Sequence, residues 1–163
     1  MKAPRYANEP YEAGPLARMW INGEYRKGIS VMDRHIARML ESKKIAQALS
    51  VWIDQVIPGT VDYASSLHTL VSGEGIGLTE APRGALLHYI KYSNGSIDNY
   101  QIITPTCWNA SPTDAKGVLG PIEKALIGVE VKDANNPIEL IRIVHSFDPC
   151  TACAVHVINP TKK

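Results

Sequence analysis

An α+β fold, mainly helical with one β-hairpin at about residues 84–104, is the architecture that this sequence predicts. The first indication is a run of apolar residues at helical spacing across residues 30–56. The second is the pair Asn94-Gly95 between two β-rich runs, which is the strongest short signal for a hairpin. The third is a set of short helical segments bounded by proline or glycine. We therefore expect a single domain, mostly helical, with a small antiparallel sheet.

A short helix over 16–21 and then one long helix are predicted in the first part of the chain. Residues 1–29 otherwise contain many prolines and glycines and read as irregular. Ser30 followed by Asp33 resembles a capping box, and nine apolar residues then recur at helical spacing as far as Val56. A helix of about 27 residues would span roughly 40 Å. Long helices usually pack in bundles, so this helix predicts partners that the chain itself does not supply.

The middle of the chain predicts a second, shorter helix over 60–70 and then an interruption at three alternating glycines, Gly73, Gly75 and Gly77. No Lys-Ser/Thr pair follows these glycines, and no dinucleotide fingerprint fits them, so they do not indicate a nucleotide site. We expect them to allow a close approach of backbone to a buried site.

The hairpin is predicted to pair residues 84–91 with residues 97–104. Because its strands are antiparallel, their outer ends meet, and this brings Arg83 and Thr106 to the same end of the hairpin. Two polar groups that are distant in the sequence thus become neighbours.

The last part of the chain predicts a turn-rich segment over 108–121, a short helix over 122–127 and a final helix over 137–144. Pro149 disfavours helix at Asp148. The cysteine-containing segment that follows is therefore predicted to be a loop held against the final helix.

Composition excludes several classes of partner. The net charge of +1, with interleaved signs, provides no field that would attract nucleic acid or an anionic membrane. No run approaches the length of a membrane span, and no signal peptide is recognisable. Three cysteines do not make a disulfide framework. The expected compartment is the cytoplasm by default, or the membrane or periplasm if a partner's signal carries the chain there.

Two cysteines in a Cys-x-x-Cys pair, Cys150 and Cys153, lie close to His156 near the end of the sequence. Such a pair points both sulfurs toward one centre, and thiolates select Zn, Fe, Ni or Cu(I). A zinc half-site, a redox dithiol and two unrelated core cysteines fit the spacing as well. A closed zinc site lacks two ligands here, because Cys107 has no cysteine or histidine nearby and reads as a packed small apolar residue.

The run from His145 to Cys150, with Cys153 and His156 after it, resembles the C-terminal signature of nickel-iron hydrogenase large subunits. Further segments of this chain resemble the same family: Lys2-Ala3-Pro4-Arg5-Tyr6, Gly14-Pro15-Leu16-Ala17-Arg18-Met19, Glu80-Ala81-Pro82-Arg83-Gly84-Ala85-Leu86 with His88, Asn99-Tyr100-Gln101, and Pro105 with Trp108-Asn109. The resemblance covers the whole chain but only about the last third of such a subunit. It implies the C-terminal portion of that fold over residues 1–156, incomplete without its N-terminal portion, and a cleavable maturation tail over residues 157–163.

The resemblance implies a role for each polar residue of the signature. Cys150 matches the terminal thiolate on nickel and Cys153 the thiolate that bridges nickel to iron. A terminal thiolate is the better proton acceptor of the two. Arg83 matches an arginine above the metals, where its permanent charge would assist catalysis, and Asp148 matches a carboxylate that helps to anchor it.

The cofactor contacts that the resemblance implies involve five further positions. Thr106, with Pro105 beside it, and Pro82 match residues around the cyanide ligands of iron. His156 matches the last residue of a mature subunit, where its ring binds a magnesium or iron ion together with the backbone carbonyl of Ile102.

The implied function is reversible heterolytic cleavage of H2 to protons and electrons at a nickel-iron centre with CO and cyanide on iron. The implied partners are the N-terminal part of the large subunit, which carries the other two cysteine ligands, a small subunit with iron-sulfur clusters, and a maturation endopeptidase. The chain lacks that upstream motif, and we therefore expect a split subunit or a fragment. The alternatives are a metal-free, hydrogenase-derived assembly or binding module, an unprocessed precursor, and a zinc-binding module.

Overall fold

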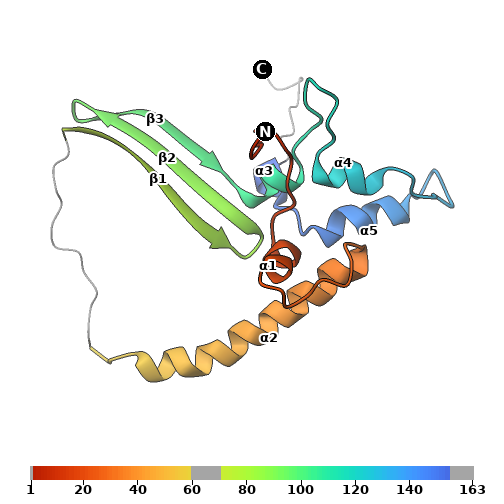
Figure 1. Ribbon diagram of the computed structural model, residues 1–163, viewed down its shortest axis with the longest axis horizontal. Coiled ribbons are helices and arrows are strands. Elements are labelled where there is room, and N and C mark those ends of the chain that lie inside the picture. The colour runs from red at the N-terminus through yellow and green to blue at the C-terminus, as the bar shows by residue number, and fades with distance from the viewer. Residues whose placement is uncertain (1, 60–70, 155–163) are drawn as a thin grey trace, which may run out of the picture.

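A computed structural model describes residues 2–59 and 71–154 of the chain. Its elements are, in order, α1 (Pro15–Ile21), α2 (Val31–Gln55), β1 (Ser72–Ala81), β2 (Gly84–Ser93), β3 (Ser96–Ile103), α3 (Pro105–Asn109), α4 (Pro121–Leu126), α5 (Ile138–Ser146) and α6 (Thr151–Ala154). The helices form a body from which the sheet and the far half of α2 extend toward the same side (Figure 1). The fold is α+β and mainly helical, as predicted.

The long helix α2 forms where the sequence predicts it. Ser30 is its N-cap: the Asp33 backbone N–H donates to Ser30 Oγ at 3.2 Å, and the Ser30 N–H donates to Asp33 Oδ2 at 2.7 Å. The hydroxyl and the backbone N–H of Ser30 help to hold the pKa of the Asp33 carboxyl below its ordinary value. The capping box therefore fixes the start of the helix.

The apolar core lies between α1 and the first half of α2. Leu16 and Met19 of α1 pack with Tyr25 and with Ala37 of α2, and all four side chains are buried. Beside this core, the guanidinium carbon of Arg34 lies 3.8 Å from the centre of the Phe147 ring. Helix α2 is thus the element against which both α1 and the end of α5 are fastened.

The sheet is antiparallel in the order β1-β2-β3. The hairpin between β2 and β3 turns at Asn94-Gly95, where both residues have positive φ, as a two-residue turn of type I′ requires. The predicted hairpin is confirmed, and the strand β1 extends it by pairing Leu78 with Leu87 of β2.

Strand β1 corrects the prediction for the three alternating glycines. Gly73, Gly75 and Gly77 do not interrupt the chain but lie within β1, on one side of the strand. A Cβ added at any of them would meet nothing within 4 Å in the described part of the chain. They therefore approach no buried site here. Glycine disfavours strand locally, and only the pairing with β2 determines this conformation.

Two further segments differ from their prediction. Pro105–Asn109 forms the helix α3, because Pro105 suits the first position of a helix. The end of this helix overlaps the segment over 108–121 that was predicted to be turn-rich. The cysteine-containing segment is only partly a loop, since the helix α6 begins directly after Cys150. Helices α4 and α5 lie within two residues of their predicted bounds. The helix predicted over 60–70 and the tail at 157–163 lie outside the described residues.

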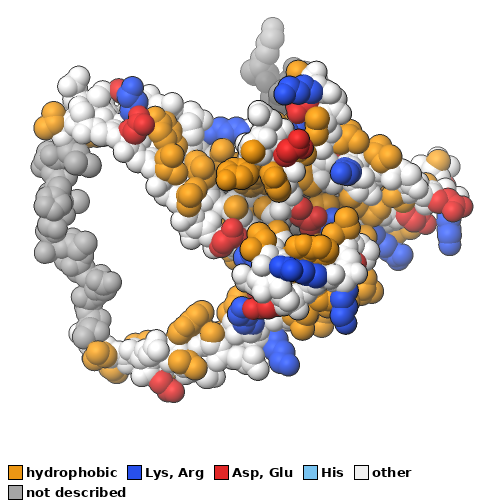
Figure 2. Space-filling view, in the orientation of Figure 1, with side chains coloured by type: hydrophobic (Ala, Val, Ile, Leu, Met, Phe, Trp, Pro, Cys, Tyr) orange, Lys and Arg blue, Asp and Glu red, His pale blue; other side chains and the backbone are white. Residues whose placement is uncertain are grey.

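Many large apolar side chains are exposed on the far half of α2 and on the sheet (Figure 2). On α2 they include Ile45, Leu49, Trp52 and Ile53, and on the sheet Ile76, Leu78, Ile97 and Tyr100. None of the helices that the structure describes is long and apolar enough to cross a membrane. Large exposed apolar side chains gathered on one helix are suited to contact with another protein.

Candidate functional site

The cysteine pair lies directly after α5, at the edge of the helical body. Asp148 links the helix to the pair with a left-handed backbone, φ +51°, and its N–H donates to the carbonyl of His145 at 2.9 Å. The Cα atoms of Cys150 and Cys153 are 5.3 Å apart, and their sulfurs are joined in a disulfide. The Cys153 N–H donates to the Cys150 carbonyl at 3.0 Å, which closes the turn of α6. The two sulfurs thus converge as the spacing predicts.

Arg83 reaches this segment from the turn between β1 and β2. Its Nε–H donates to the Asp148 carbonyl at 2.9 Å, and its Nη2 donates to Asp148 Oδ1 at 3.2 Å. Both side chains are just under half exposed, so the ion pair by itself contributes little stability. The predicted pairing of Arg83 with Asp148 is present in the fold.

Thr106 meets the same segment from α3. Its side chain is buried, and its Oγ1 accepts a hydrogen bond from the Cys150 N–H at 3.0 Å. Because Thr106 is the second residue of α3, its own backbone N–H has no acceptor within the helix. Pro105 beside it is buried as well. Arg83 and Thr106, which the hairpin was predicted to bring together, therefore converge on two residues of one loop, Asp148 and Cys150.

Other predicted residues have different surroundings. The Ile102 carbonyl accepts a hydrogen bond from Lys2 Nζ at 3.0 Å. His156 lies outside the described residues. Pro82 is exposed, and its carbonyl accepts from Arg18 Nη2 at 2.9 Å. Cys107 is buried and not in a disulfide, which agrees with the packed apolar role predicted for it.

Two arginines that the sequence did not single out for the site hold its parts in place. Arg18 of α1 donates to two carbonyls of the chain just before Arg83. Arg38 of α2 donates through Nη2 to the Ser146 carbonyl at 2.8 Å, two residues before Asp148. The Gly-Pro-Leu-Ala-Arg segment that contains Arg18 is one of the motifs of the sequence, but nothing in the local pattern indicates which carbonyls Arg18 binds.

The donors present fit a soft metal only in part. Two cysteine sulfurs at one point are the ligands that nickel, iron or zinc prefer, once they are reduced to thiolates. In the described part of the chain, no group of three histidine, cysteine, aspartate or glutamate residues could hold a metal ion. The pair therefore fits half of a four-thiolate site, and any remaining ligands come from outside the described residues.

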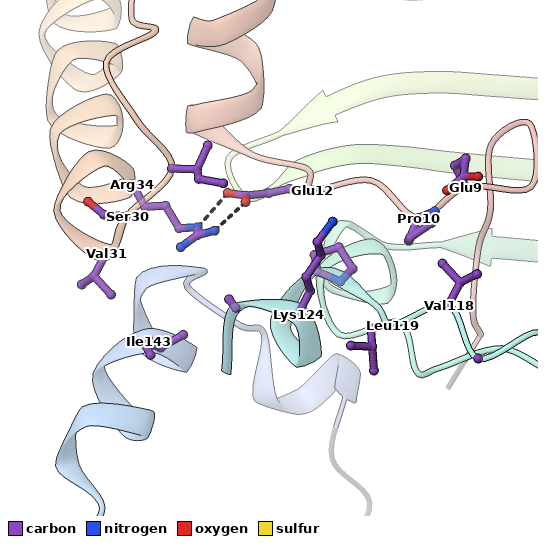
Figure 3. Close-up of a pocket in the computed structure, with 14 residues that line it drawn as sticks. Glu9, Pro10, Glu12, Ser30, Val31, Arg34, Val118, Leu119, Lys124 and Ile143 are labelled. Atoms are coloured by element: carbon purple, nitrogen blue, oxygen red, sulfur yellow. Dashed lines mark hydrogen bonds and ion pairs between the residues drawn. The ribbon is translucent and has the colours of Figure 1, made fainter. Parts of the chain in front are cut away.

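A cavity of about 770 Å³ lies elsewhere, between the N-terminal segment, the start of α2 and α4 (Figure 3). Its walls are largely apolar, and within it Arg34 and Glu12 form a two-pronged ion pair with distances of 2.8 and 2.7 Å. No residue of the cysteine segment lines this cavity. We therefore assign the candidate site to the cysteine segment and not to the cavity.

Comparison with known proteins agrees with the signature at this site. A profile described as nickel-dependent hydrogenase matches residues 21–156. The chain is 44% identical to the periplasmic [NiFeSe] hydrogenase large subunit of Desulfomicrobium baculatum, over 98% of this chain and 35% of that protein. It is 34% identical to the hydrogenase-1 large chain of Escherichia coli, over 97% of this chain and 31% of that protein.

Solved structures give the same result. An [NiFeSe] hydrogenase structure from Dm. baculatum matches with a TM-score of 0.84 and 45% identity, over 94% of this chain and 36% of that one. A Ni-Fe-Se hydrogenase from D. vulgaris Hildenborough matches with a TM-score of 0.85 and 40% identity, over 94% of this chain and 37% of that one. The chain spans about a third of the length of these relatives.

Proposed function

The chain belongs to the nickel-dependent hydrogenase family, as a region of the large subunit, and we propose that it supplies the nickel-binding part of an enzyme that cleaves H2 reversibly into protons and electrons. The observation that carries the proposal is the convergence of Cys150, Cys153, Arg83 and Thr106 at one loop. These residues come from three separate parts of the sequence. Their meeting is what a metal centre with a basic thiolate and a nearby cation needs.

Cys150 and Cys153 would hold the nickel-iron centre as reduced thiolates. That centre, with CO and cyanide on iron, supplies the Lewis acidity that polarises H2. Thr106 is suited to the cyanide ligands, because its backbone N–H is free of intrahelical bonding and its hydroxyl hydrogen remains available while Oγ1 accepts from Cys150. A buried acceptor such as cyanide is costly without such donors.

The chain's own residues would handle the proton. Cys150 would be the base that takes up the proton, because a thiolate within reach of the reacting group can accept one. Arg83, which donates to the Asp148 carbonyl two residues before Cys150, would supply a cation with planar donors near that thiolate. Asp148 fixes the direction of Arg83 by accepting both at its carbonyl and at its carboxylate. The magnesium or iron ion that the resemblance implies at the Ile102 carbonyl and His156 stays part of the proposal, and His156 lies outside the described residues.

The remaining ligands would come from the part of the large subunit that this chain does not span. Arg34 and Ala37 on α2 face the helical body and are buried. The same side of α2 continues through Ile45, Leu49 and Trp52, which are 46%, 48% and 53% exposed. A helix face whose apolar side chains are buried in one half and exposed in the other is suited to contact with a second polypeptide. We propose that this polypeptide carries the two further cysteines. A small subunit with iron-sulfur clusters would receive the electrons.

Metal analysis of the complex from its native source tests this proposal. We expect nickel and iron in the complex, H2 uptake with an artificial acceptor, and loss of both nickel and uptake in Cys150→Ser. Cys107→Ala is the matched control, since Cys107 is a buried cysteine outside the loop, and it should retain nickel. Full H2 uptake in Cys150→Ser would refute the ligand assignment.

A metal-free assembly or binding module is the second candidate, since the described residues contain no group of three residues that could hold a metal ion. The mass of the chain in the same complex separates the two. A chain that ends at His156 and carries nickel supports the enzyme with a cleaved tail. A chain that runs through Lys163, without nickel and with the disulfide intact, supports the module or an unprocessed precursor.

A further inference from the structure

The guanidinium of Arg18 is fully engaged at the base of the turn that carries Arg83. Its Nε and Nη2 donate to the two carboxylate oxygens of Glu41 at 2.6 Å each. Its Nη1 donates to Glu80 Oε2 at 2.7 Å. The remaining donors go to the carbonyls of Ala81, at 3.1 Å, and Pro82, at 2.9 Å. An arginine has five N–H donors, and all five have acceptors here.

These five bonds join three elements at one point. Arg18 lies in α1, Glu41 in α2, and Glu80 at the end of β1. The Pro82 carbonyl belongs to the peptide bond that precedes Arg83, so the bond from Arg18 acts on the backbone of that residue directly. The two-pronged contact with Glu41 fixes the plane of the guanidinium, and it raises the pKa of Arg18.

The other side of the turn is fixed by backbone packing. A Cβ added at Gly14, just before α1, would lie 3.1 Å from the Arg83 carbonyl oxygen. A Cβ added at Gly84 would lie 2.6 Å from the Gly14 nitrogen. The segment from Gly14 to Arg18 thus holds the backbone of Arg83 from two sides, by close contact and by hydrogen bonds.

The Arg83–Asp148 pair needs such support. Both of its side chains are exposed to solvent, and an exposed ion pair does not fix its own geometry. On the other side of the pair, Arg38 of α2 binds the Ser146 carbonyl and holds the end of α5. Arg38 and Glu41 lie one turn apart on α2, so a single helix sets the distance between the turn with Arg83 and the loop with Asp148.

We infer that Arg18, held by Glu41, is the positioning residue that directs Arg83 toward Asp148 and Cys150. This inference rests on the proposed function for its effect on turnover, but its structural part concerns the chain alone. Lysine would keep the charge of Arg18 but lose the fork that reaches Glu41 and two carbonyls at once. Arg18→Lys should therefore release the turn while the charge is retained.

Hydrogen exchange of the Arg83 Nε–H in the full chain, labelled with ¹⁵N-arginine, tests the structural part. In Arg18→Lys we expect this exchange to become about tenfold faster, because the bond to the Asp148 carbonyl weakens. The matched control is Arg26→Lys, since Arg26 follows α1 and, within residues 2–59 and 71–154, donates to the carbonyls of Trp20 and Ile21. If Arg18→Lys does not fold, Glu41→Gln is the second variant. It replaces one of the two carboxylate oxygens that accept from Arg18 and should accelerate the exchange by a smaller factor. An unchanged exchange rate in the folded variant would overturn the inference.

A double-mutant cycle in the assembled complex tests the effect on turnover. We expect Arg18→Lys to lower kcat for H2 uptake about tenfold with KM unchanged, and to have no further effect once Arg83 is replaced by lysine. Equal losses in both backgrounds would indicate a general structural role and would overturn positioning through Arg83. Absence of nickel and of uptake in the unmodified complex would instead contradict the proposed function, and it would leave the exchange measurement on the chain valid.

Discussion

Replacement of Gly84 by alanine should destabilise the chain by displacing the turn that carries Arg83. Gly84 has φ +130°, which L residues rarely adopt. A Cβ there would lie 2.6 Å from the Gly14 nitrogen and 2.8 Å from the Ala13 Cβ, so backbone has to move. Strain of this kind costs about 1–3 kcal/mol, and the overpacking costs about 1–3 kcal/mol more.

The expected loss in the free energy of unfolding is thus about 4 kcal/mol for Gly84→Ala. With a urea dependence of about 2 kcal/mol per molar, the unfolding midpoint should fall by about 2 M. Circular dichroism of the full chain in a urea titration measures this shift. Gly77→Ala is the matched control, because a Cβ at Gly77 meets nothing within 4 Å, and its midpoint should change little. A midpoint for Gly84→Ala equal to that of Gly77→Ala would refute the close contact with Gly14.

Three other changes follow from the site and from α2. Arg83→Lys should leave nickel bound while H2 turnover falls by orders of magnitude, and metal analysis together with an uptake assay measures both. Unchanged kinetics would show that the role of Arg83 is structural only. Thr106→Val should leave the Cys150 N–H without its acceptor and cost about 1–3 kcal/mol in a urea titration, whereas a wild-type midpoint would contradict the bond. Because Asp33 has a lowered pKa when folded, its contribution to stability is present above its unfolded pKa of about 3.9 and is lost as the pH falls through the folded value. Thermal unfolding between pH 6 and pH 2 should show a smaller loss in Asp33→Asn than in the wild type, because the pKa values of Asp114 and Glu123 are lowered as well; the same pH profile in both would refute the assignment.

Local patterns in the sequence were sufficient for the elements that local interactions determine. Ser30 and Asp33 bond to each other across one helical turn, and Asn94-Gly95 adopts its turn through its own backbone preferences. The strand at Gly73–Gly77 could not be predicted in this way, because glycine has no preference for strand and the pairing with β2 is long-range. Its conformation is determined by tertiary structure.

The residues of the site also fall into those that a local pattern predicts and those that only the tertiary structure brings together. Cys150, Cys153 and Asp148 lie within six consecutive residues, so their motif alone identifies them. The hairpin alone predicted that Arg83 and Thr106 would come to one end, and the fold brings both to that loop. The contacts of Arg18 with residues 23 and 62 positions away could not be predicted, since arginine at a helix surface carries no signal of its acceptors.

Strand β1 presents one long hydrogen-bonding edge of the sheet with neither proline nor lysine along it, and its three glycines leave one of its sides without side chains from Gly73 to Gly77. An edge of this kind is a template for strands of other chains. We therefore expect newly made chains to associate edge to edge, and to aggregate at high concentration, unless another polypeptide covers β1 soon after synthesis. The order of events in the cell would then be constrained: the partner has to be present before this chain accumulates.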